Sequence, residues 1–440
     1  MKWYLGAIVL LAAALIFELG LMAYAMYALL GVMLLSRFLA RRWAESLDAE
    51  RECNRFSANV GETVAVILRV RNRGSLPLAW VLLEDLLPPQ AVGGPAPRLE
   101  VLGSRLHLAM LFPRGRKTLF YQLRCRGRGY FQLGPLMVET GDLFGLHRRF
   151  RVATAPHFLL VYPKIVPLEG YDIASRRPIG EVRLTHRLYE DPTRIAGVRE
   201  YQAGDPLNRI HWRATARTGS IHSKVYEPST VAGATLVVDF HRDSFEPSHE
   251  PFRSELAVTA AASVAHALYH LGQQVGLVSN GRDAVDRIRR EGWDPDPQNR
   301  LVARQTAAML DSSDRLQPLM VETRRGPDQL LRILETLARL ELTDGLTLAQ
   351  ALDETVGRMP RDATVLAIVT KVTLATAMAL GELRRRGFAV AALVNAYHLH
   401  EFEAACGPLL AEGVEARHLP DEAAVAAVCE DCLLRGSVHR

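Results

Sequence analysis

The stretch that decides the architecture is residues 3–35, WYLGAIVLLAAALIFELGLMAYAMYALLGVMLL. Glu18 is its only ionisable carboxylate, and nearly all of its other side chains are apolar. As one helix it would measure about 50 Å, which exceeds the roughly 30 Å hydrocarbon core of a bilayer. Since Glu18 and Gly20 lie at its midpoint and can form a turn, the sequence predicts a transmembrane hairpin of two short helices over residues 1–37.

The charges that flank this apolar run predict its orientation. Lys2 lies at one end, and Arg37, Arg41 and Arg42 lie at the other. The positive-inside tendency places both ends in the cytoplasm, so we expect a multi-pass inner-membrane protein with cytoplasmic soluble domains. Two alternatives remain open at this point. One long tilted span would place the soluble body outside, and a cleaved signal peptide would have a shorter apolar region followed by a small-residue cleavage site.

The composition of the whole chain narrows the class of protein. Among 440 residues, 53 are Lys or Arg and 48 are Asp or Glu, and the two signs are interspersed. A nucleic-acid binder should instead carry a concentrated basic face. Five cysteines form no repeating framework, which fits a reducing compartment. Cys429 and Cys432 form a C-x-x-C pair without a second pair, so we expect ordinary thiols there and no bound cofactor.

Beyond the apolar run the hydrophobic pattern changes twice. From Gly61 it alternates with period two, with short strand-like runs separated by Gly and Pro, and beyond Val231 buried strands alternate with helices. The sequence thus predicts an α+β multidomain chain whose last part has a doubly wound parallel sheet. The predicted units are the hairpin over 1–37, a charged, helix-compatible membrane-proximal stalk over 38–56, a β-sandwich over 57–165, a connector over 166–230, and an α/β domain over 231–440.

The connector contains the densest polar and aromatic stretch of the chain, VREYQAGDPLNRIHWRATARTGSIHSKVYE at residues 198–227. Asp205 and Pro206 predict the start of a short helix, and Gly219 predicts its end. On such a helix Arg209, Arg213 and Arg217 would form one stripe. Two interpretations stay open: a solvated Arg face, or a surface on which guanidinium groups, with the neighbouring Trp212 and Tyr201, bind an acidic partner.

This stretch resembles the signature of the bacterial family catalogued as domain of unknown function 58, R-x-Y-x-x-G-D-x-x-x-R-I-H-W-x-x-x-A-R followed by K-x-x-E. The residues that fit it are Arg199, Tyr201, Gly204, Asp205, Arg209, Ile210, His211, Trp212, Ala216, Arg217, Lys224 and Glu227. Residues 126–130, 134–135, 142–146 and 161–163 are similar to upstream elements of the family, as is the N-terminal pair of membrane helices. These signature residues, together with Arg213 of the arginine stripe, are the candidates for binding a partner if the second interpretation holds.

The resemblance also implies a context. Members of the family are usually encoded beside MoxR-type AAA+ ATPases, often with von Willebrand factor A-domain proteins and transglutaminase-like membrane proteins, and no catalytic activity is established for them. Their C-terminal part is considered related to von Willebrand factor A domains. We therefore expect a non-enzymatic scaffold or adaptor, working with a MoxR-type ATPase in the assembly or maturation of envelope or secreted complexes.

A von Willebrand factor A-like domain would hold a divalent metal through D-x-S-x-S after its first strand, with a later Thr and Asp. Here the equivalent residues are Asp239, His241, Asp243 and Thr370, and Lys371 stands where the second Asp would be. Only the first Asp and the Thr match, and a nearby cation would oppose a bound metal. The sequence therefore predicts a degenerate site without a metal.

Other chemistry has little support in the sequence. It has no G-x-x-x-x-G-K-[ST] loop for ATP and no G-x-S-x-G nucleophile elbow. The alternative function is a hydrolase whose acid–base site would use His211 and Asp205, with His222 nearby. A nucleic-acid binder that uses the Arg stripe is a third hypothesis, weakened by the modest net charge of +5.

Overall fold

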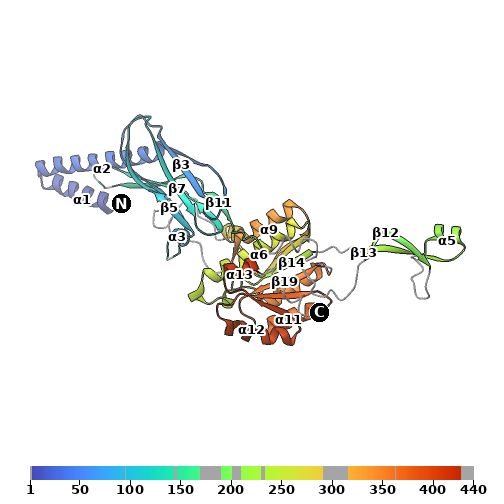
Figure 1. Cartoon of the computed structure of the whole chain (residues 1–440). Helices are drawn as coiled ribbons and strands as arrows, with labels where there is room; N and C mark the ends of the chain where they lie inside the picture. The colour runs from blue at the N-terminus through green and yellow to red at the C-terminus, as the bar shows by residue number, and fades with distance from the viewer. Residues whose placement is uncertain are drawn as a thin grey trace. The chain divides into compact units, whose positions relative to one another are not determined.

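The computed structural model describes residues 2–94, 96–142, 145, 147–168, 190–200, 210–228, 233–290, 316–361 and 363–427. It is a mixed α+β chain with a long apolar helix near its N-terminus and several sheets, as predicted at that level (Figure 1). Its contacts divide it into two compact units. Unit 1 contains Met1–Lys164, Arg282–Ser313 and Glu335–Glu341, and unit 2 contains Ile165–Gly281, Asp314–Leu334 and Leu342–Arg440.

Unit 1 begins with two antiparallel helices, α1 (Lys2–Ile16) and α2 (Gly20–Ser46). The turn between them has Glu18 at φ 53°, in the left-handed region. The helices lie side by side, and the Tyr4 hydroxyl of α1 donates to the Met33 carbonyl of α2 at 3.0 Å (Figure 1). Only α2 among the described helices is long and apolar enough to cross a membrane, while residues 4–16 form a shorter apolar helix.

The predicted helix-compatible stalk over residues 38–56 is wrong in its second half. α2 ends at Ser46, and residues Leu47–Cys53 form strand β1, which pairs antiparallel with β3. The charged side chains of this segment do not lie on a solvated helix, because they form ion pairs with side chains of the neighbouring β3 segment. Asp48 forms an ion pair with Arg73, and Glu52 forms one with Arg69. Leu47 meanwhile joins the core.

The rest of unit 1 consists mainly of β-sheets. One sheet has the order β1-β3-β7-β5, a second has β10-β9-β4-β6, and a smaller third has β2-β11-β8. The strands are β2 (Ser57–Asn59), β3 (Thr63–Asn72), β4 (Leu78–Asp85), β5 (Leu99–Gly103), β6 (Leu106–Leu111), β7 (Arg116–Cys125), β8 (Gly129–Leu133), β9 (Leu136–Gly141), β10 (Arg148–Thr154) and β11 (His157–Tyr162). A short helix, α3 (Pro89–Val92), precedes β5, and β16 (Arg282–Asp283), α7 (Ala284–Arg290) and β18 (Leu340–Glu341) also belong to this unit.

The two four-stranded sheets share one hydrophobic core. Alternate residues of β3, including Val64 and Val66, are buried as the period-two pattern predicts. They pack in the same cluster as Val81 and Leu83 of β4. Trp43 at the end of α2 is also in this cluster, so the core fixes the helix to the sandwich.

Unit 2 contains a six-stranded sheet with the order β17-β15-β14-β19-β20-β21. Its strands are β14 (Gly233–Val238), β15 (Gln274–Ser279), β17 (Leu319–Arg324), β19 (Thr364–Val369), β20 (Val390–Val394) and β21 (Glu415–His418). All neighbours pair in parallel except β17, which is antiparallel to β15. The order reverses between β14 and β19, so their carboxyl ends form the switch point of a doubly wound sheet.

Helices cover both faces of this sheet. α6 (Phe252–His270) lies on one side, and α11 (Leu374–Arg385) and α12 (Leu399–Ala411) lie on the other (Figure 1). Further described helices are α9 (Pro327–Arg339), α10 (Leu348–Thr355) and α13 (Glu422–Ala427), with 3₁₀ turns η2 (Arg242–Ser244), η3 (Pro247–His249) and η4 (Val356–Arg358). Side chains cap two of the helix starts: Thr347 and Gln350 form a capping box for α10, and Thr373 accepts from the Thr376 amide in α11.

Candidate functional site

The signature segment folds as a small two-stranded ribbon that carries a helix. β12 (Glu190–Glu200) pairs antiparallel with β13 (His222–Pro228), and α5 (Trp212–Thr218) lies between them in the sequence (Figure 1). We call the described residues 190–200 and 210–228 the arm. In its register Val198 lies opposite Lys224, and Glu200 lies opposite His222.

α5 is held at both ends by specific hydrogen bonds. The His211 Nδ1 atom accepts from the Ala214 backbone amide at 3.0 Å and so caps the first turn. Gly219 ends the helix with φ 75°, and its amide donates to the Thr215 carbonyl. The predicted helix end at Gly219 is therefore confirmed, and the left-handed backbone there explains why glycine occupies the position.

The predicted helix start at Asp205 and Pro206 lies outside the described residues, but a continuous helix from there to Gly219 is wrong. Ile210 still forms a β-bridge with Ser223, and the His211 amide donates to the His222 carbonyl at 2.8 Å. The chain is thus extended at Ile210, and the helix begins only at Trp212. At Ile210 and His211 the backbone hydrogen-bonds to the β13 segment, which prevents these residues from continuing a helix that begins at Pro206.

This shorter helix changes the predicted stripe of arginines. Arg213 and Arg217 lie four residues apart on α5, so they share one face, and both side chains are exposed. Arg209 lies outside the described residues, so the structure places two of the three members. Trp212 at the start of the helix has 71% of its surface exposed.

The exposed side chains are carried on a fixed backbone. The His222 amide donates to the Thr215 hydroxyl at 3.1 Å, which fastens β13 to the middle of α5. The His222 Nδ1 atom lies 2.8 Å from the Ser220 carbonyl and 3.1 Å from the Thr218 hydroxyl. Ile210 and Ser223 are buried beneath this cluster.

The remaining signature residues are only partly placed. Tyr201, Gly204 and Asp205 lie outside the described residues. Arg199 is an exposed residue of β12, opposite Ser223 in the register. Lys224 and Glu227 belong to β13, and of these two residues the structure describes only the backbone.

The position of His211 bears on the alternative acid–base site. Its Nδ1 atom accepts a hydrogen bond, so the neutral ring carries its proton on Nε2. A carboxylate that orients a catalytic imidazole usually receives a proton from Nδ1–H, which this tautomer lacks. As an N-cap, His211 has a structural role in the described part of the arm.

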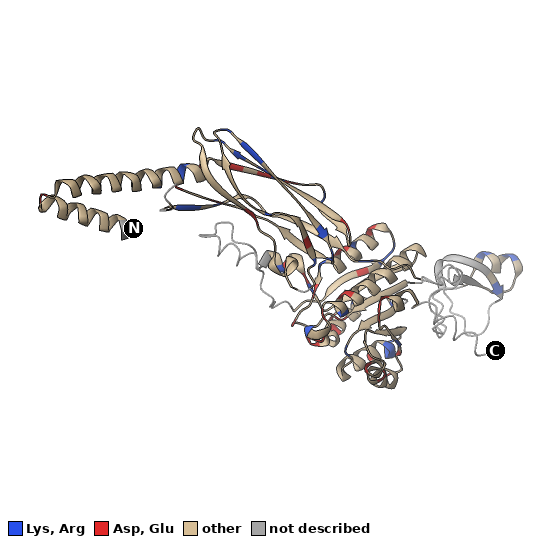
Figure 2. Ribbon diagram, turned by 60° about the vertical axis from the view of Figure 1, so that its left-hand side comes forward, with Lys and Arg blue, Asp and Glu red and all other residues tan. Residues whose placement is uncertain are grey.

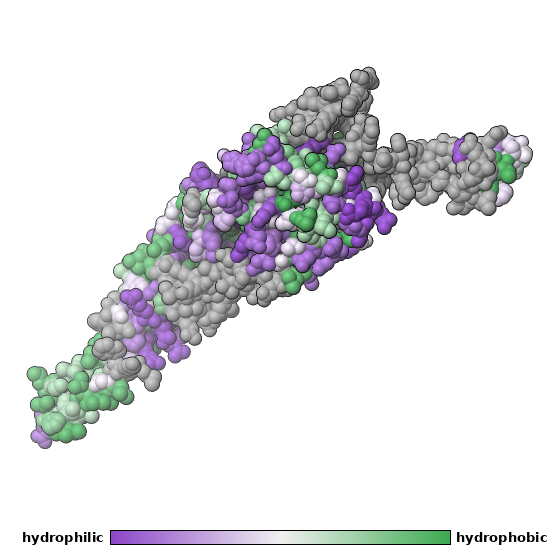
Figure 3. Space-filling model, turned by 90° about the horizontal axis from the view of Figure 1, so that it is seen from below, coloured by the Kyte–Doolittle hydropathy of each residue, from purple (hydrophilic) through white to green (hydrophobic). Residues whose placement is uncertain are grey.

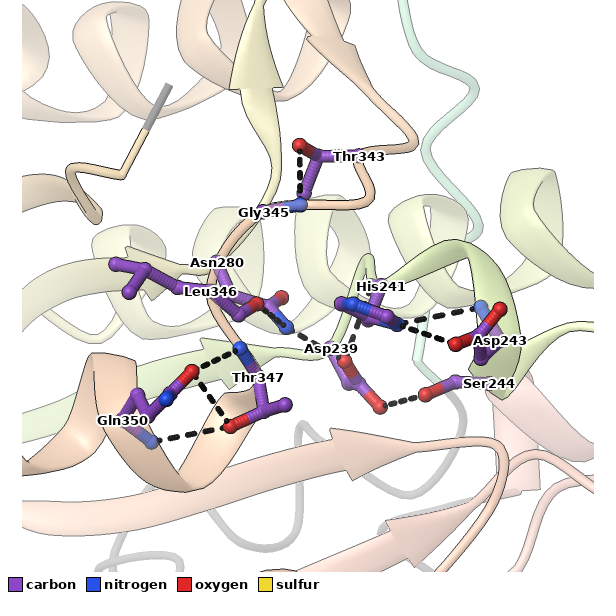
Figure 4. Close-up of polar contacts among 10 residues, drawn as sticks. All are labelled: Asp239, His241, Asp243, Ser244, Asn280, Thr343, Gly345, Leu346, Thr347 and Gln350. Carbon is purple, nitrogen blue, oxygen red and sulfur yellow. Dashed lines mark hydrogen bonds and ion pairs between the residues drawn. The ribbon is translucent and has the colours of Figure 1, made fainter. Parts of the chain in front are cut away.

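The second candidate site is the carboxyl edge of the unit 2 sheet (Figure 4). Asp239 directly follows β14 and is buried. One of its carboxylate oxygens accepts from the Asn280 amide at 2.9 Å and the His241 backbone at 3.1 Å, and the other accepts from the Ser244 hydroxyl at 2.6 Å. Burial raises the Asp239 pKa above its ordinary value, and these hydrogen bonds offset part of that rise.

Other residues of the degenerate metal motif form hydrogen bonds with nearby groups of the protein. His241 Nδ1 accepts from the Asp243 amide at 3.2 Å and caps η2, while 87% of the Asp243 side chain is exposed. The Asn395 amide donates to the Thr370 hydroxyl at 3.3 Å. Within the described ranges, no three His, Cys, Asp or Glu residues are grouped as a metal would need.

Two members of the Asp239 network were not predicted. Asn280 follows β15, where its amide bridges Asp239 and the Leu346 carbonyl, and its oxygen accepts from the Phe240 amide at 2.7 Å. Ser244 lies five residues after Asp239 in a turn that no short motif describes. A polar residue directly after a buried strand is the sequence signal that could have identified Asn280.

Comparison with known proteins agrees with the signature. Residues 197–293 match the family model described as "Protein of unknown function DUF58". The uncharacterized protein YeaD of Bacillus subtilis (strain 168) is 27% identical over 295 residues, which cover 64% of this chain and 69% of YeaD.

Solved structures are only remotely similar. The CARDB domain of a Pyrococcus furiosus protein matches 26% of this chain and 91% of its own length, with 13% identity and a TM-score of 0.18. The PilB minor pilin of Streptococcus sanguinis matches 70% of this chain and 74% of its own, with 8% identity and a TM-score of 0.30. These scores are too low to support any argument about fold or function. By its sequence, the chain carries a DUF58 domain and is homologous to YeaD.

Proposed function

We propose that this protein is a membrane-anchored adaptor, without catalytic activity of its own, that binds a protein partner through the arm. The observation that carries the proposal is the arrangement on α5. The Trp212, Arg213 and Arg217 side chains are exposed. The backbone of the helix is held by a hydrogen bond that His211 accepts and by hydrogen bonds that the His222 and Gly219 amides donate.

The composition of the exposed arm fits a protein partner. Ile221 and Val198, which are 51% and 41% exposed, add apolar surface to the 71% exposed Trp212. Tryptophan and arginine are the residues most enriched among those that dominate binding energy at protein interfaces. Because the helix is already capped and fastened, little conformational entropy would be lost on binding. An acidic partner surface would complement Arg213 and Arg217.

The N-terminal helices support anchoring in a membrane. Their apolar side chains are largely exposed, including Leu5, Ile16 and Leu21 at 69%, 76% and 89%, and Figure 3 shows hydrophobic residues covering this end of the chain. Exposed apolar surface of this kind is suited to lipid. With α1 and α2 both inserted, the protein would cross the bilayer twice.

A small polar cluster supports the hairpin arrangement. The Tyr4 hydroxyl lies 3.1 Å from His147 Nε2, and the Ser36 hydroxyl lies 3.0 Å from His147 Nδ1. The N-terminus and the middle of α2 therefore lie beside the same loop of the sandwich, and the Glu18 turn lies at the far end of the helix pair (Figure 1). From Gly20 to Ser36 the helix is about 25 Å long, which a locally thinned bilayer accommodates.

The direction of insertion and the partner follow from charge and family. Arg37, Arg41 and Arg42 come after the inserted part of α2, so the positive-inside tendency places the soluble units in the cytoplasm. The partner we propose is a MoxR-type AAA+ ATPase, with von Willebrand factor A-domain or transglutaminase-like membrane proteins as further members of an envelope or secretion assembly. In this proposal the unit 2 sheet is a von Willebrand factor A-like domain whose Asp239 serves structure instead of metal binding.

The adaptor is tested by co-purification of the full-length protein in detergent with the candidate ATPase under nucleotide-trapping conditions. Arg213→Glu should abolish the association and Trp212→Ala should strongly reduce it, and both should leave the fold intact. Arg325→Glu, at another exposed arginine of unit 2, is the matched control and should bind normally. Normal binding by both arm variants would overturn the proposal. A reporter at the C-terminus tests orientation, and activity in the periplasm would contradict it.

A further inference from the structure

We propose that one end of the unit 1 sandwich rests on the headgroups of an anionic bilayer, in addition to the helices that cross it. The surface consists of two adjacent turns, residues 73–77 and 112–115, with the strand ends beside them. This inference rests on the proposed membrane anchoring and adds a lipid contact that the anchor alone does not require.

Strand pairing places these turns at the end of the sandwich where α2 arrives. Leu47, the first residue after α2, lies opposite Asn72 at the end of β3. The Arg73 amide donates to the Ser46 carbonyl at 2.8 Å, so the first turn is bonded to the last residue of the helix. Leu78 and Leu111 are paired at the same end, which brings the second turn beside the first.

A buried asparagine joins the two turns. Asn72 is fully buried, and its side-chain amide donates to the Leu76 carbonyl at 2.9 Å and the Phe112 carbonyl at 3.1 Å. Its side-chain oxygen accepts from the Gly74 amide at 2.9 Å, and its backbone amide donates to the Gly115 carbonyl. Leu76 and Phe112 are thereby held close together at the surface, where 42% and 70% of their areas are exposed.

The same end is strongly basic. The cations are Arg71, Arg73, Arg114, Arg116 and Lys117, all of them exposed. Figure 2 shows basic residues on the strands at this end of the sandwich. Glu45 and Asp48 lie nearby, where they pair with Arg41 and Arg73. Cations therefore outnumber the carboxylates.

The register leaves this charge only partly compensated. Arg71 of β3 lies opposite Arg116 of β7 on one side and opposite Asp48 of β1 on the other. The Asp48 carboxylate forms its ion pair with Arg73, and like charges in directly opposed positions destabilise a sheet. Phosphate groups of a lipid surface would neutralise them, while Phe112 and Leu76 reach the apolar side of the interface. Exposed aromatic and aliphatic tips between arginines are typical of a membrane-interface contact.

The distance along α2 permits this contact. Arg37, the first cation after the apolar part, is nine residues before Ser46. That separation is about 14 Å along a helix. The lipid headgroups occupy part of this distance, and their charge acts over a further Debye length of about 8 Å. Helix tilt brings one side of the sandwich closer still.

The test uses the full-length protein reconstituted in vesicles of phosphatidylcholine, with or without phosphatidylglycerol, that contain headgroup spin-labelled phosphatidylcholine. Phe112→Trp places a fluorophore on the proposed contact, and Leu76→Trp is a second, independent position. Phe56→Trp is the matched control because Phe56 is 56% exposed and lies beyond the other end of β1. The wild-type signal from the five native tryptophans is subtracted.

We expect quenching at positions 112 and 76 to exceed that at position 56 by about twofold or more in phosphatidylglycerol vesicles, and to fall in neutral vesicles or high salt. Arg114→Gln, Arg116→Gln and Lys117→Gln together should remove most of this excess. Protein that floats with the vesicles and resists carbonate extraction is anchored in the membrane. If such protein shows equal quenching at all three positions, the lipid contact is overturned and the anchoring is not. Protein that does not float overturns the anchored adaptor as well. Equal shielding of position 112 from acrylamide in micelles and vesicles would identify a second copy on this surface and also overturn the inference.

Discussion

At the end of β14 the Asp239 carboxylate is buried and accepts hydrogen bonds from Ser244, Asn280 and the His241 backbone, whereas on α5 the Arg213 and Arg217 side chains are exposed. In the first region protein donors occupy both carboxyl oxygens, which leaves less capacity for a ligand. In the second, hydrogen bonds fix the backbone and leave the side chains open. The comparison supports a structural role for the Asp239 network and agrees with our proposal that a partner binds the arm.

The largest effect should come from Asp239→Ala. This change leaves three donors without their acceptor in a buried site, which costs about 3 kcal/mol of unfolding free energy. Denaturation of the detergent-solubilised full-length protein measures it. Asp243→Ala removes a nearby carboxylate whose side chain is 87% exposed and should cost little. Equal losses in the two variants would remove the distinction between a structural and an exposed carboxylate.

Trp212→Ala should produce the opposite pattern. The side chain is 71% exposed, so the unfolding free energy should change by less than about 0.5 kcal/mol. Partner affinity should fall about 30-fold, equivalent to roughly 2 kcal/mol, as for a residue that dominates an interface. Leu374→Ala, at an equally exposed position on α11, is the control and should leave affinity unchanged. A similar loss of affinity in both variants would mean that the arm is not the specific surface.

His211 allows the arm itself to be examined. His211→Ala removes the cap on the Ala214 amide and should destabilise α5 by about 1 kcal/mol. Amide exchange at Ala214 and Thr215 reports this loss directly. His211→Asn keeps an acceptor at the cap and should restore most of the protection. If His211→Asn restores protection while a phenotype is still lost, the imidazole has a further role and the hydrolase hypothesis gains support.

Elements set by local sequence patterns could be predicted, whereas elements set by pairing between distant residues could not. Period-two burial in β3 and the alternation of buried strands with helices in unit 2 follow from local patterns, so the sequence predicted both. Strand β1 was missed because its alternating charges fit a helix equally well until their partners Arg69 and Arg73 are known. The start of α5 was misplaced for the same reason, since the pairing of Ile210 with Ser223 is a contact between distant positions.

The candidate sites show the same limit. The motif comparison identified Asp239 as the residue that follows β14, with His241 and Asp243 where the motif has serines. It could not identify Asn280, because that residue meets Asp239 only once β14 and β15 are paired. On the arm, the sequence identified Trp212, Arg213 and Arg217 as candidate binding residues. It could not show that they are exposed, because this depends on which face of α5 packs against the strands.

The smallest predicted effect is a pH dependence at Asp239. Burial raises its pKa in the folded protein above the ordinary 3.8, so the folded state holds this proton more tightly than the unfolded state does. The stabilising contribution is complete below about 3.8 and is lost as pH rises through the folded pKa.

Asp239→Asn cannot titrate, and its amide keeps the shape of the carboxyl group. The difference in unfolding free energy between wild type and Asp239→Asn should therefore shrink as pH increases from about 4 toward neutrality. Denaturation of both proteins across this range measures the difference, and Asp243→Asn provides an exposed control that should show no such trend. A difference that grows with pH would mean that the hydrogen bonds from Ser244 and Asn280 outweigh burial and hold Asp239 ionised. The site would then keep a negative charge inside unit 2, and the contrast with the cationic arm would become one of charge as well as exposure.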